Sequence, residues 1–332
     1  MFNNKKRLKN NMDRPILLKD IDVVIYHKNC QDGINSAFIF KYACKKKRKY
    51  IKMIGSLHDG NEVNLEEIRG KNVIMVDIVT ENIKLIKEIS NNFYVLDHHI
   101  SSYEKYKFEN YIYFDMDKCG TTLAYEYVYH NQEPPDFIKC IQARDLWTWG
   151  IKNSKEFTTG FYELGNDRSV NLYKVFKELI EEDENEKFNE IIKFGKKIIK
   201  KVNKRINELF NDIIITNVKI NKEDNKEDNK EDNKEDNKED NKKDKEYKII
   251  KIEVNDEDYR IRSDFGNYCV ENIDIDFIVI YKYNKNNDQY YCSLRCMKGR
   301  FDLNNENIGN GHPCAAGLTL DIHPDNYFVN IY

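Results

Sequence analysis

Residues 93–99, with the sequence Phe-Tyr-Val-Leu-Asp-His-His, join a short apolar run to one acid and two histidines. Two earlier runs have the same apolar character, Asp-Val-Val-Ile-Tyr at 22–26 and Asn-Val-Ile-Met-Val-Asp at 72–77. Stretches with helical spacing, at 34–43 and 81–90, separate the three runs. Buried strands that alternate with helices predict an α/β fold with a parallel sheet in the first half of the chain.

Polar side chains follow each apolar run. The first run leads into His-Lys-Asn-Cys-Gln-Asp-Gly at 27–33, the second ends in Asp77, and the third ends in the tripeptide 97–99. Because the carboxyl ends of parallel strands line the ligand crevice of an open sheet, these groups should converge. A single aspartate there is more often a helix cap, and a lone histidine a hydrogen-bonded bystander. Several such residues at successive strand ends favour a metal site, with donors that suit manganese, magnesium, iron or zinc.

A further acidic position, Asp145, lies in Gln-Ala-Arg-Asp-Leu-Trp-Thr-Trp at 142–149, which contains both tryptophans of the chain. Helical spacing at 121–130 and 137–145 places Asp145 at the end of a helix. Taken alone, this stretch is best interpreted as a surface acid beside a core pair of tryptophans.

The second half has a different pattern. A charged helical stretch at 171–210 suits one long connecting helix. Strand-like runs follow at 213–220, 247–254, 277–283 and 289–296, with a helix-like segment near 266–272. This order predicts a small α+β domain of mixed strands.

One loop of the second half favours anion binding. Residues 308–317 read Ile-Gly-Asn-Gly-His-Pro-Cys-Ala-Ala-Gly, and glycines beside a histidine let backbone N–H groups approach an anion. The strand before it delivers Arg295, whose guanidinium can hold a phosphate in a fork. The simpler alternative is a tight turn with a structural histidine.

Charge limits the classes of partner. The chain has 332 residues and a net charge of −3, but residues 221–240 are five copies of Asn-Lys-Glu-Asp, and the remainder carries +2. The repeat has no apolar face, so it is predicted to be a flexible hairpin insert over 221–245. A near-neutral body argues against a basic coating protein and against a processive grip on long nucleic acid.

The termini and cysteines suggest a cytoplasmic protein with reduced thiols. No run approaches the 18 or so apolar residues of a membrane span, and the Lys- and Asn-rich start lacks a signal peptide's apolar run. Residues 1–20 are expected to be a disordered basic extension. The 8 cysteines contain no Cys-x-x-Cys pair, which argues against a zinc ribbon.

Taken together, these motifs resemble the DHH phosphoesterase superfamily. The residues that carry the resemblance are His27, the Asp32-Gly33 pair, Asp77, the 97–99 tripeptide and the Arg-Asp-Leu-Trp stretch, and the 309–317 run resembles the signature of the DHH-associated domain. The resemblance implies a DHH domain at 21–165, a helical connector at 166–210 and a DHH-associated substrate-binding domain at 211–332. It also implies a cleft between the two domains and leaves a homodimer open.

The resemblance further implies a role for each matching residue. Asp97 would orient the site and His99 would contact the scissile phosphate or protonate the leaving group. Two divalent ions, most often manganese, would be held by His27, Asp32, Asp77, His98 and Asp145, with Asp77 as the bridging carboxylate. Phosphate would be bound by Arg295 and His312, with Gly309 and Gly311 shaping the loop.

Two positions depart from the family's pattern. Cys30 stands where an Asp-x-Asp pattern is usual, so Asn29 or Cys30 could contribute a ligand, and a soft thiolate would shift the preference toward zinc or iron. Asn310 stands where a glycine is usual, a milder change because asparagine tolerates the left-handed conformation.

The implied reaction is metal-assisted hydrolysis of a phosphoester. Short oligonucleotides or small nucleotides are the expected substrates, as in nanoRNases that also dephosphorylate phosphoadenosine phosphate. Exopolyphosphatase and cyclic-dinucleotide phosphodiesterase activities are the alternatives within the family. An alternative of another class is a nucleotide- or nucleic-acid-binding protein whose hydrolysis is weakened by the Cys30 change.

Overall fold

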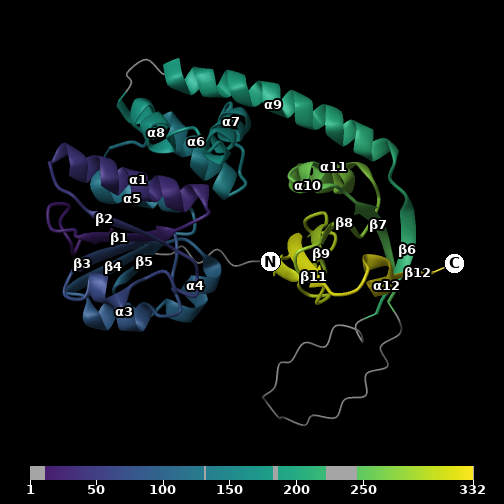
Figure 1. Ribbon diagram of the computed structural model, residues 1–332, viewed down its shortest axis with the longest axis horizontal. Coiled ribbons are helices and arrows are strands. Elements are labelled where there is room, and N and C mark those ends of the chain that lie inside the picture. The colour runs from purple at the N-terminus through teal and green to yellow at the C-terminus, as the bar shows by residue number, and fades with distance from the viewer. Residues whose placement is uncertain (1–11, 131, 182–185, 222–244, 332) are drawn as a thin grey trace, which may run out of the picture. The chain divides into compact units, whose positions relative to one another are not determined.

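A computed structural model describes residues 12–130, 132–181, 186–221 and 245–331, and of Asn310 and His312 it describes the backbone alone. The chain divides into two compact units, residues 1–199 and 200–332 (Figure 1). Most of the expected basic extension and nearly all of the expected repeat insert lie outside the described residues.

The first unit is built on a parallel sheet, as the sequence predicted. In the described residues this sheet has five strands in the order β2-β1-β3-β4-β5. Their bounds are β1 (Val23–His27), β2 (Lys52–Ser56), β3 (Asn72–Val76), β4 (Asn92–Asp97) and β5 (Ile112–Phe114). Because β2 and β3 flank β1 on opposite sides, the strand order reverses at β1. In open α/β sheets such a switch point opens a crevice at the carboxyl ends of the strands.

Helices cover both faces of this sheet (Figure 1). On one face lie α1 (Gln31–Lys46) and α5 (Gly120–Val128), and the other face carries α2 (Leu65–Ile68), α3 (Ile83–Ile89) and α4 (Ile100–Tyr106). Successive strand residues point to opposite faces. Accordingly, Val24 packs in the core that contains Phe40 of α1, whereas Ile25 packs in the core that contains Ile86 of α3.

The charged stretch at 171–210 forms two helices rather than the one that its pattern predicted. They are α8 (Leu172–Glu181) and α9 (Glu186–Asn211), and they follow α6 (Asp136–Asp145) and α7 (Ser154–Asn166). Phe176 of α8 and Ile191 of α9 bury in the same core, although one straight helix would set them about 22 Å apart. None of the helices in the described ranges is long and apolar enough to cross a membrane.

The second unit is a mixed α+β domain, again as predicted. Its described strands form a seven-stranded sheet in the order β10-β11-β9-β8-β7-β6-β12. The strands are β6 (Ile215–Ile220), β7 (Tyr247–Glu253), β8 (Phe277–Asn284), β9 (Gln289–Arg295), β10 (Asn310–His312), β11 (Ala315–Leu320) and β12 (Phe328–Asn330). The helices are α10 (Asp256–Tyr259), α11 (Arg262–Asn272) and α12 (Pro324–Tyr327). Among the described strand pairs of this second sheet, only β7 and β8 run parallel, and α10 and α11 connect them.

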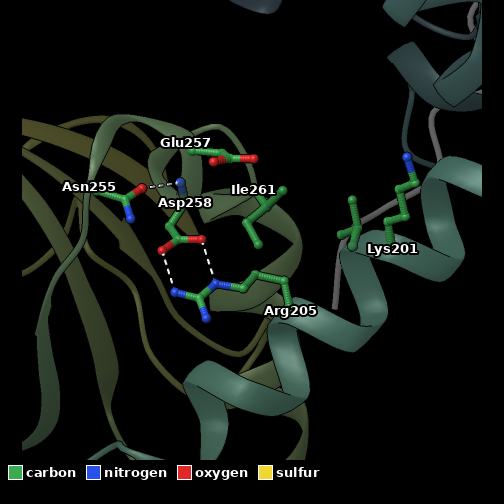
Figure 2. A pocket seen from close by; sticks show the side chains of 7 residues that line it. Lys201, Arg205, Asn255, Glu257, Asp258 and Ile261 are labelled. Atoms are coloured by element: carbon green, nitrogen blue, oxygen red, sulfur yellow. Dashed lines mark hydrogen bonds and ion pairs between the residues drawn. The ribbon is translucent and has the colours of Figure 1, made fainter.

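The end of α9 is fastened to α10 by an ion pair (Figure 2). Arg205 donates from Nε and Nη2 to the two carboxylate oxygens of Asp258, at 2.8 and 2.7 Å. Asn255 caps α10 by accepting from the Asp258 amide at 2.8 Å. The surrounding pocket has a volume of about 300 Å³. Since its central charges neutralise each other, we assign this pocket a structural role.

Candidate metal centre

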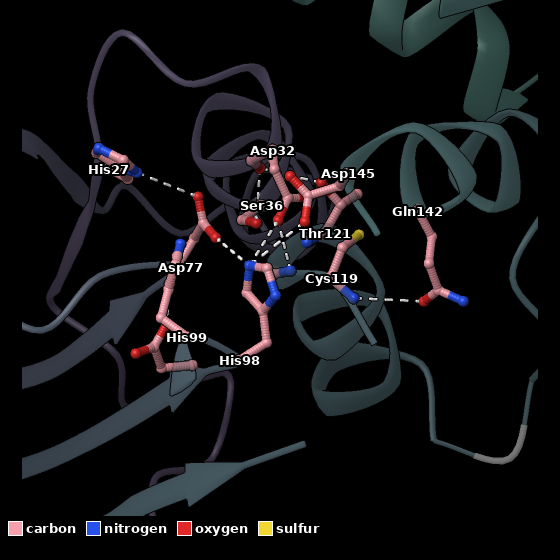
Figure 3. Close-up of polar contacts among 12 residues, drawn as sticks. His27, Asp32, Ser36, Asp77, His98, His99, Cys119, Thr121, Gln142 and Asp145 are labelled. Atoms are coloured by element: carbon pink, nitrogen blue, oxygen red, sulfur yellow. Dashed lines mark hydrogen bonds and ion pairs between the residues drawn. The ribbon is translucent and has the colours of Figure 1, made fainter. Parts of the chain in front are cut away.

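The carboxyl ends of β1, β3 and β4 bring the predicted site residues of the first unit together (Figure 3). β1 ends at His27, Asp77 follows β3, and β4 ends at Asp97 just before the two histidines. Two helix ends complete the cluster, with Asp32 from the first turn of α1 and Asp145 from the last residue of α6. The expected convergence at the sheet edge is therefore present in the structure.

Asp77 lies at the middle of the cluster. Its backbone has a positive φ of 62°, which turns the chain sharply where β3 ends. One carboxylate oxygen, Oδ1, lies 3.0 Å from His98 Nε2, and the other, Oδ2, lies 3.6 Å from His27 Nδ1. The side chain is only 1% exposed. The buried carboxylate of Asp77 thus faces one imidazole with each of its oxygens.

Asp32 connects the cluster to a second helix. Its carboxylate accepts hydrogen bonds from the backbone amides of Gly120 and Thr121, the latter at 2.8 Å, at the N-terminus of α5. A carboxylate there satisfies free N–H groups and interacts favourably with the helix dipole. Each carboxylate oxygen keeps a second lone pair. Asp32 can therefore fasten α5 and still bind a cation, and its Oδ2 lies 3.7 Å from His98 Nε2.

Two glycines allow α1 and α5 to approach the strand ends this closely. A Cβ on Gly33 would lie 2.3 Å from the carbonyl oxygen of His27 and 3.0 Å from Asp77 Oδ2. A Cβ on Gly120 would lie 2.6 Å from the Cβ of Asp77. Any side chain at either position would push α1 or α5 away from the strand ends. These two glycines therefore determine the size of the cluster.

The charges of the cluster are unbalanced. Burial raises the pKa of Asp32 well above its usual range, and the facing Asp77 and Asp145 raise it further. Burial alone would also raise the pKa of Asp77, but the facing imidazole of His27 and the hydrogen bond with His98 outweigh it and lower that pKa. Burial opposes the charge of His98, yet its hydrogen bond to Asp77 and the nearby carboxylates raise its pKa to about 9. Without another cation, His98 is the group that neutralises the site.

Asp97 and His99 form a pair of their own. The Nδ1 atom of His99 lies 2.7 Å from Oδ1 of Asp97, whose side chain is fully buried. The His99 ring is one-third exposed. Asp97 therefore holds the ring in one orientation while the opposite nitrogen, Nε2, remains accessible.

His58 is a neighbour of the cluster that the sequence analysis missed. Its ring centroid lies 5.2 Å from that of His27 and 6.4 Å from that of His99. It follows β2, so it occupies a fourth strand end at the same sheet edge. The Lys-Met-Ile-Gly-Ser sequence of β2 lacks a continuous apolar run, and this concealed the strand. A histidine two residues beyond that short segment was the available signal.

The donor set fits divalent metal ions. Three groups each place their ligand atoms within 4.8 Å of one another, and these are His27–Cys30–Asp77, Asp77–His98–His99 and Asp32–His98–Asp145. Two buried atoms, His27 Nδ1 and Asp77 Oδ2, have no hydrogen-bond partner among the described residues. Buried polar atoms are rarely left unpaired, so a cation at this position would account for both. Oxygen and nitrogen donors of this kind bind first-row divalent metals.

The two tryptophans beyond Asp145 do not form the core pair that the sequence suggested. Trp147 is 55% exposed, and its ring meets that of the half-buried Trp149 edge to face, with centroids 5.0 Å apart. Both have a positive φ, 54° and 51°, which is a strained conformation for a bulky residue. The chain thus holds an exposed indole two residues from a predicted metal ligand.

The predicted phosphate-binding residues lie in the second unit. Arg295 ends β9 and pairs with Ala315 of β11, which in turn pairs with His312 of β10. The Cα atoms of Arg295 and His312 therefore lie on one cross-strand row, about 10 Å apart. Gly309 and Gly311 lie at the start of the same hairpin, with φ of 76° and 146°. The expected loop is thus the β10–β11 hairpin.

Neutral groups hold the Arg295 guanidinium. It donates to Ser263 Oγ at 2.7 Å, to the Leu294 carbonyl at 2.7 Å and to Ser293 Oγ at 3.2 Å. None of these three hydrogen bonds goes to a carboxylate. Burial and the nearby Arg262 lower its pKa, because both disfavour an additional positive charge. An anion would relieve this imbalance.

The comparison with protein families concerns the first unit. Residues 22–151 match the DHH family, N-terminal domain. This match agrees with the sequence resemblance, and the matched range includes every predicted metal ligand. The match does not extend into the second unit, so a DHH-associated domain there remains a prediction.

One curated relative aligns with part of the chain. Over 172 residues the chain is 37% identical to the uncharacterized protein R106 of Acanthamoeba polyphaga mimivirus, and the alignment covers 48% of this chain and 40% of that protein. The chain thus aligns with about two fifths of that relative's length.

Three solved structures are similar over most of the chain. One is an uncharacterized protein from Helicobacter pylori G27, with 16% identity, a TM-score of 0.35, and coverage of 91% of this chain and 94% of that one. The second is the pGpG-specific phosphodiesterase PggH from Vibrio cholerae, with 10% identity, a TM-score of 0.47, and coverage of 92% and 94%. The third is a putative family II inorganic pyrophosphatase from Methanococcus jannaschii, with 15% identity, a TM-score of 0.30, and coverage of 93% and 96%. At these TM-scores the likeness carries no argument about activity.

Proposed function

We propose that the chain is a divalent-metal-dependent phosphoesterase of the DHH superfamily that hydrolyses short oligonucleotides or small nucleotides. One observation carries the proposal. The three groups of ligand atoms overlap, because Asp77 belongs to two of them and His98 belongs to two. Two neighbouring divalent ions would share these ligands, as in two-metal phosphoesterases. The DHH-family match over residues 22–151 supports the same proposal.

In this proposal two divalent ions, manganese in the first instance, are held by a set of five side chains. The set is His27, Asp32, Asp77, His98 and Asp145. When bound, the ions polarise the phosphoryl oxygens and lower the pKa of a coordinated water to roughly 7. Asp77 would help to hold both ions, because its two oxygens face the different imidazoles of His98 and His27, at 3.0 and 3.6 Å.

His99 is proposed to protonate the leaving oxygen of the substrate. Since Asp97 engages its Nδ1 atom, Nε2 is the nitrogen that can reach substrate. Burial alone would lower the pKa of His99, but the hydrogen bond and charge of Asp97 raise it. This direction favours the protonated ring, which suits a general acid. Asp97 is a positioning residue in this assignment.

The exposed indole of Trp147 supports a nucleotide substrate over polyphosphate. Bases stack on aromatic side chains, and each stacked base contributes about 1–3 kcal/mol of binding free energy. Trp147 lies two residues beyond the proposed ligand Asp145, so a base stacked there would be close to a phosphate bound at the metals. Polyphosphate has no aromatic group that could use this surface.

In the second unit we propose that Arg295, with the hairpin that contains Gly309, Gly311 and His312, binds a phosphate group. The support is the guanidinium held by neutral oxygens, and its position on one cross-strand row with His312. On this basis we also propose that the second unit is the DHH-associated domain implied by the sequence.

The test of catalysis uses the full chain, treated with a chelator and then supplied with manganese. Wild type should hydrolyse bis(p-nitrophenyl) phosphate or a dinucleotide, and Asp77→Ala should reduce kcat to background. Asp167→Asn is the matched control, because Asp167 is exposed and its side chain bonds only to Ser169 in the described residues. If wild type and Asp77→Ala are equally inactive with manganese, magnesium, cobalt and zinc, the enzyme proposal is wrong and the binding-protein alternative replaces it.

The test of substrate class compares kcat/KM across a panel. The panel contains a dinucleotide, an abasic dinucleotide analogue, longer oligomers, a cyclic dinucleotide, phosphoadenosine phosphate and polyphosphate. We expect the dinucleotide or phosphoadenosine phosphate to lead, and Trp147→Ala to raise KM about tenfold for the dinucleotide but not for its abasic analogue. A preference for polyphosphate or for the cyclic dinucleotide would replace the proposed substrate with that alternative.

A further inference from the structure

Cys30 occupies an unusual position at the edge of the candidate metal centre. It is the N-cap residue of α1, between His27 at the end of β1 and Asp32 in the first turn of the helix. N-cap side chains commonly accept a hydrogen bond from the first turn. In the described structure the Cys30 side chain makes no such capping bond. No capping bond of ordinary geometry therefore holds the half-buried thiol, although it lies near the backbone amides of Gly33 and Asp32.

The sulfur instead belongs to a group of possible metal ligands. Cys30 Sγ, one nitrogen of His27 and one oxygen of Asp77 all lie within 4.8 Å of one another. Within this trio, His27 Nδ1 and Asp77 Oδ2 are the two buried atoms that lack a hydrogen-bond partner among the described residues. The thiol is thus adjacent to two polar atoms whose burial calls for a ligand.

The spacing of these atoms matches a small coordination sphere. With bonds of about 2.1 Å, two ligand atoms lie about 3.4 Å apart in a tetrahedral site and about 3.0 Å apart in an octahedral one. The distance from His27 Nδ1 to Asp77 Oδ2 is 3.6 Å, so one ion could contact both atoms. Tetrahedral sites with sulfur and nitrogen donors are typical of zinc rather than of magnesium or manganese.

Two other cysteines have carbonyl partners of their own. Cys296 donates to the Phe301 and Pro313 carbonyls at 3.3 and 3.4 Å, and Cys44 donates to the Leu18 carbonyl at 3.8 Å. Those thiols satisfy their hydrogen-bonding needs within the fold. Cys30 faces the carboxylate of Asp77, so a thiolate there requires a cation beside it.

We propose that Cys30 Sγ is a metal ligand, and that it makes the His27–Cys30–Asp77 half of the centre selective for a thiophilic divalent ion such as zinc, cobalt or iron. The inference rests on the proposed function only in taking the cluster as a metal centre. The other half, Asp32–His98–Asp145, offers only oxygen and nitrogen donors and accepts a harder ion such as manganese. The two halves of the centre would therefore hold ions of different elements.

Cobalt is the probe, because thiolate ligation to Co²⁺ produces a charge-transfer absorption in the near ultraviolet. The metal-free full chain is titrated with Co²⁺ and the spectrum recorded. Wild type should show the band at one equivalent. Cys30→Ser and Cys30→Asp should lack it, and Cys44→Ala, a cysteine change at the other end of α1, should retain it. Circular dichroism confirms that each variant is folded.

Metal competition provides the second readout. Cys30→Asp should bind zinc at least about tenfold more weakly than wild type and manganese more tightly, since a carboxylate replaces the soft ligand. Cobalt binding without the band, or a band that survives in folded Cys30→Ser, overturns the inference but leaves the phosphoesterase proposal intact. A band in wild type without hydrolysis of any substrate supports the inference and refutes the proposed activity. No metal binding at all refutes both.

Discussion

The metal centre of the first unit and the Arg295 region of the second unit have uncompensated charges of opposite sign. Around Asp77, buried carboxylates outnumber the cations, and His98 holds an additional proton as a result. Around Arg295, a guanidinium rests on hydroxyl and carbonyl oxygens with another arginine nearby. One region therefore favours a cation and the other an anion.

The largest expected effect is from Gly33→Ala, which would disrupt the metal centre of the first unit through a steric clash. The new Cβ would lie 2.3 Å from the His27 carbonyl oxygen, and backbone atoms cannot move aside cheaply. We expect loss of metal binding and roughly 1–3 kcal/mol of destabilisation. Calorimetric metal titration and thermal melting measure both.

Gly150→Ala is the matched control for that prediction, because a Cβ there meets no atom within 4 Å. Unchanged metal affinity in Gly33→Ala would show that the packing of α1 against β1 does not set the geometry of the cluster.

The next effect concerns the second region. Arg295→Ala should weaken binding of a phosphate-containing substrate by about tenfold or more, since a charge-assisted hydrogen bond contributes about 1.5–3 kcal/mol. Metal affinity should stay the same. Isothermal titration with phosphoadenosine phosphate measures substrate binding, and a separate titration with Mn²⁺ measures metal affinity. Arg69→Ala, an exposed arginine paired with Glu66, serves as control. A loss of metal binding in Arg295→Ala would contradict the separation of roles between the regions.

A pH effect of intermediate size follows from His98. Its pKa is about 9 in the folded, metal-free protein against an ordinary value of about 6.5. The stabilisation that its charge supplies is therefore complete below about pH 6.5 and is lost as the pH rises through about 9. We expect the metal-free chain to lose on the order of 1–3 kcal/mol over that interval.

Melting curves in a chelator between pH 6 and pH 9.5 test this expectation. His98→Gln should flatten the pH dependence, whereas His130→Gln, an exposed histidine, should not. A slope that is the same in wild type and His98→Gln would remove His98 as the source of the neutralising charge.

The smallest expected effect is from His58→Ala at the rim of the metal centre. His58 is exposed and contacts the cluster through the His27 and His99 rings. We expect a decrease of about threefold to tenfold in kcat/KM, with unchanged metal stoichiometry, because its ring would touch substrate rather than metal. Steady-state kinetics with the dinucleotide measures it. Loss of a metal equivalent in His58→Ala would move His58 into the ligand set.

The sheet edge could be predicted from sequence because three of its strands are continuous apolar runs. Those runs locate His27, Asp77 and the 97–99 tripeptide, and the structure places all of them at the same end of the sheet. β2 has only one fully apolar stretch of two residues, so the fourth strand end and His58 were missed. A continuous apolar run marks a strand only when both of its faces are buried.

Other features depend on contacts that the sequence does not encode locally. The predicted core pair of tryptophans contains an exposed Trp147, because positive φ values at both tryptophans turn the chain after α6. The division of 171–210 into α8 and α9 depends on which apolar residues reach the first core. Both results are set by tertiary packing, which outweighs local helical pattern.

The hydrogen bonds from α5 to Asp32 give the metal centre a built-in reporter. The amides of Gly120 and Thr121 donate to a carboxylate that is also a proposed metal ligand. Binding an ion would hold that carboxylate in place, and the two amides would then open to solvent less often. Their rates of deuterium uptake would follow metal occupancy even when no substrate turns over.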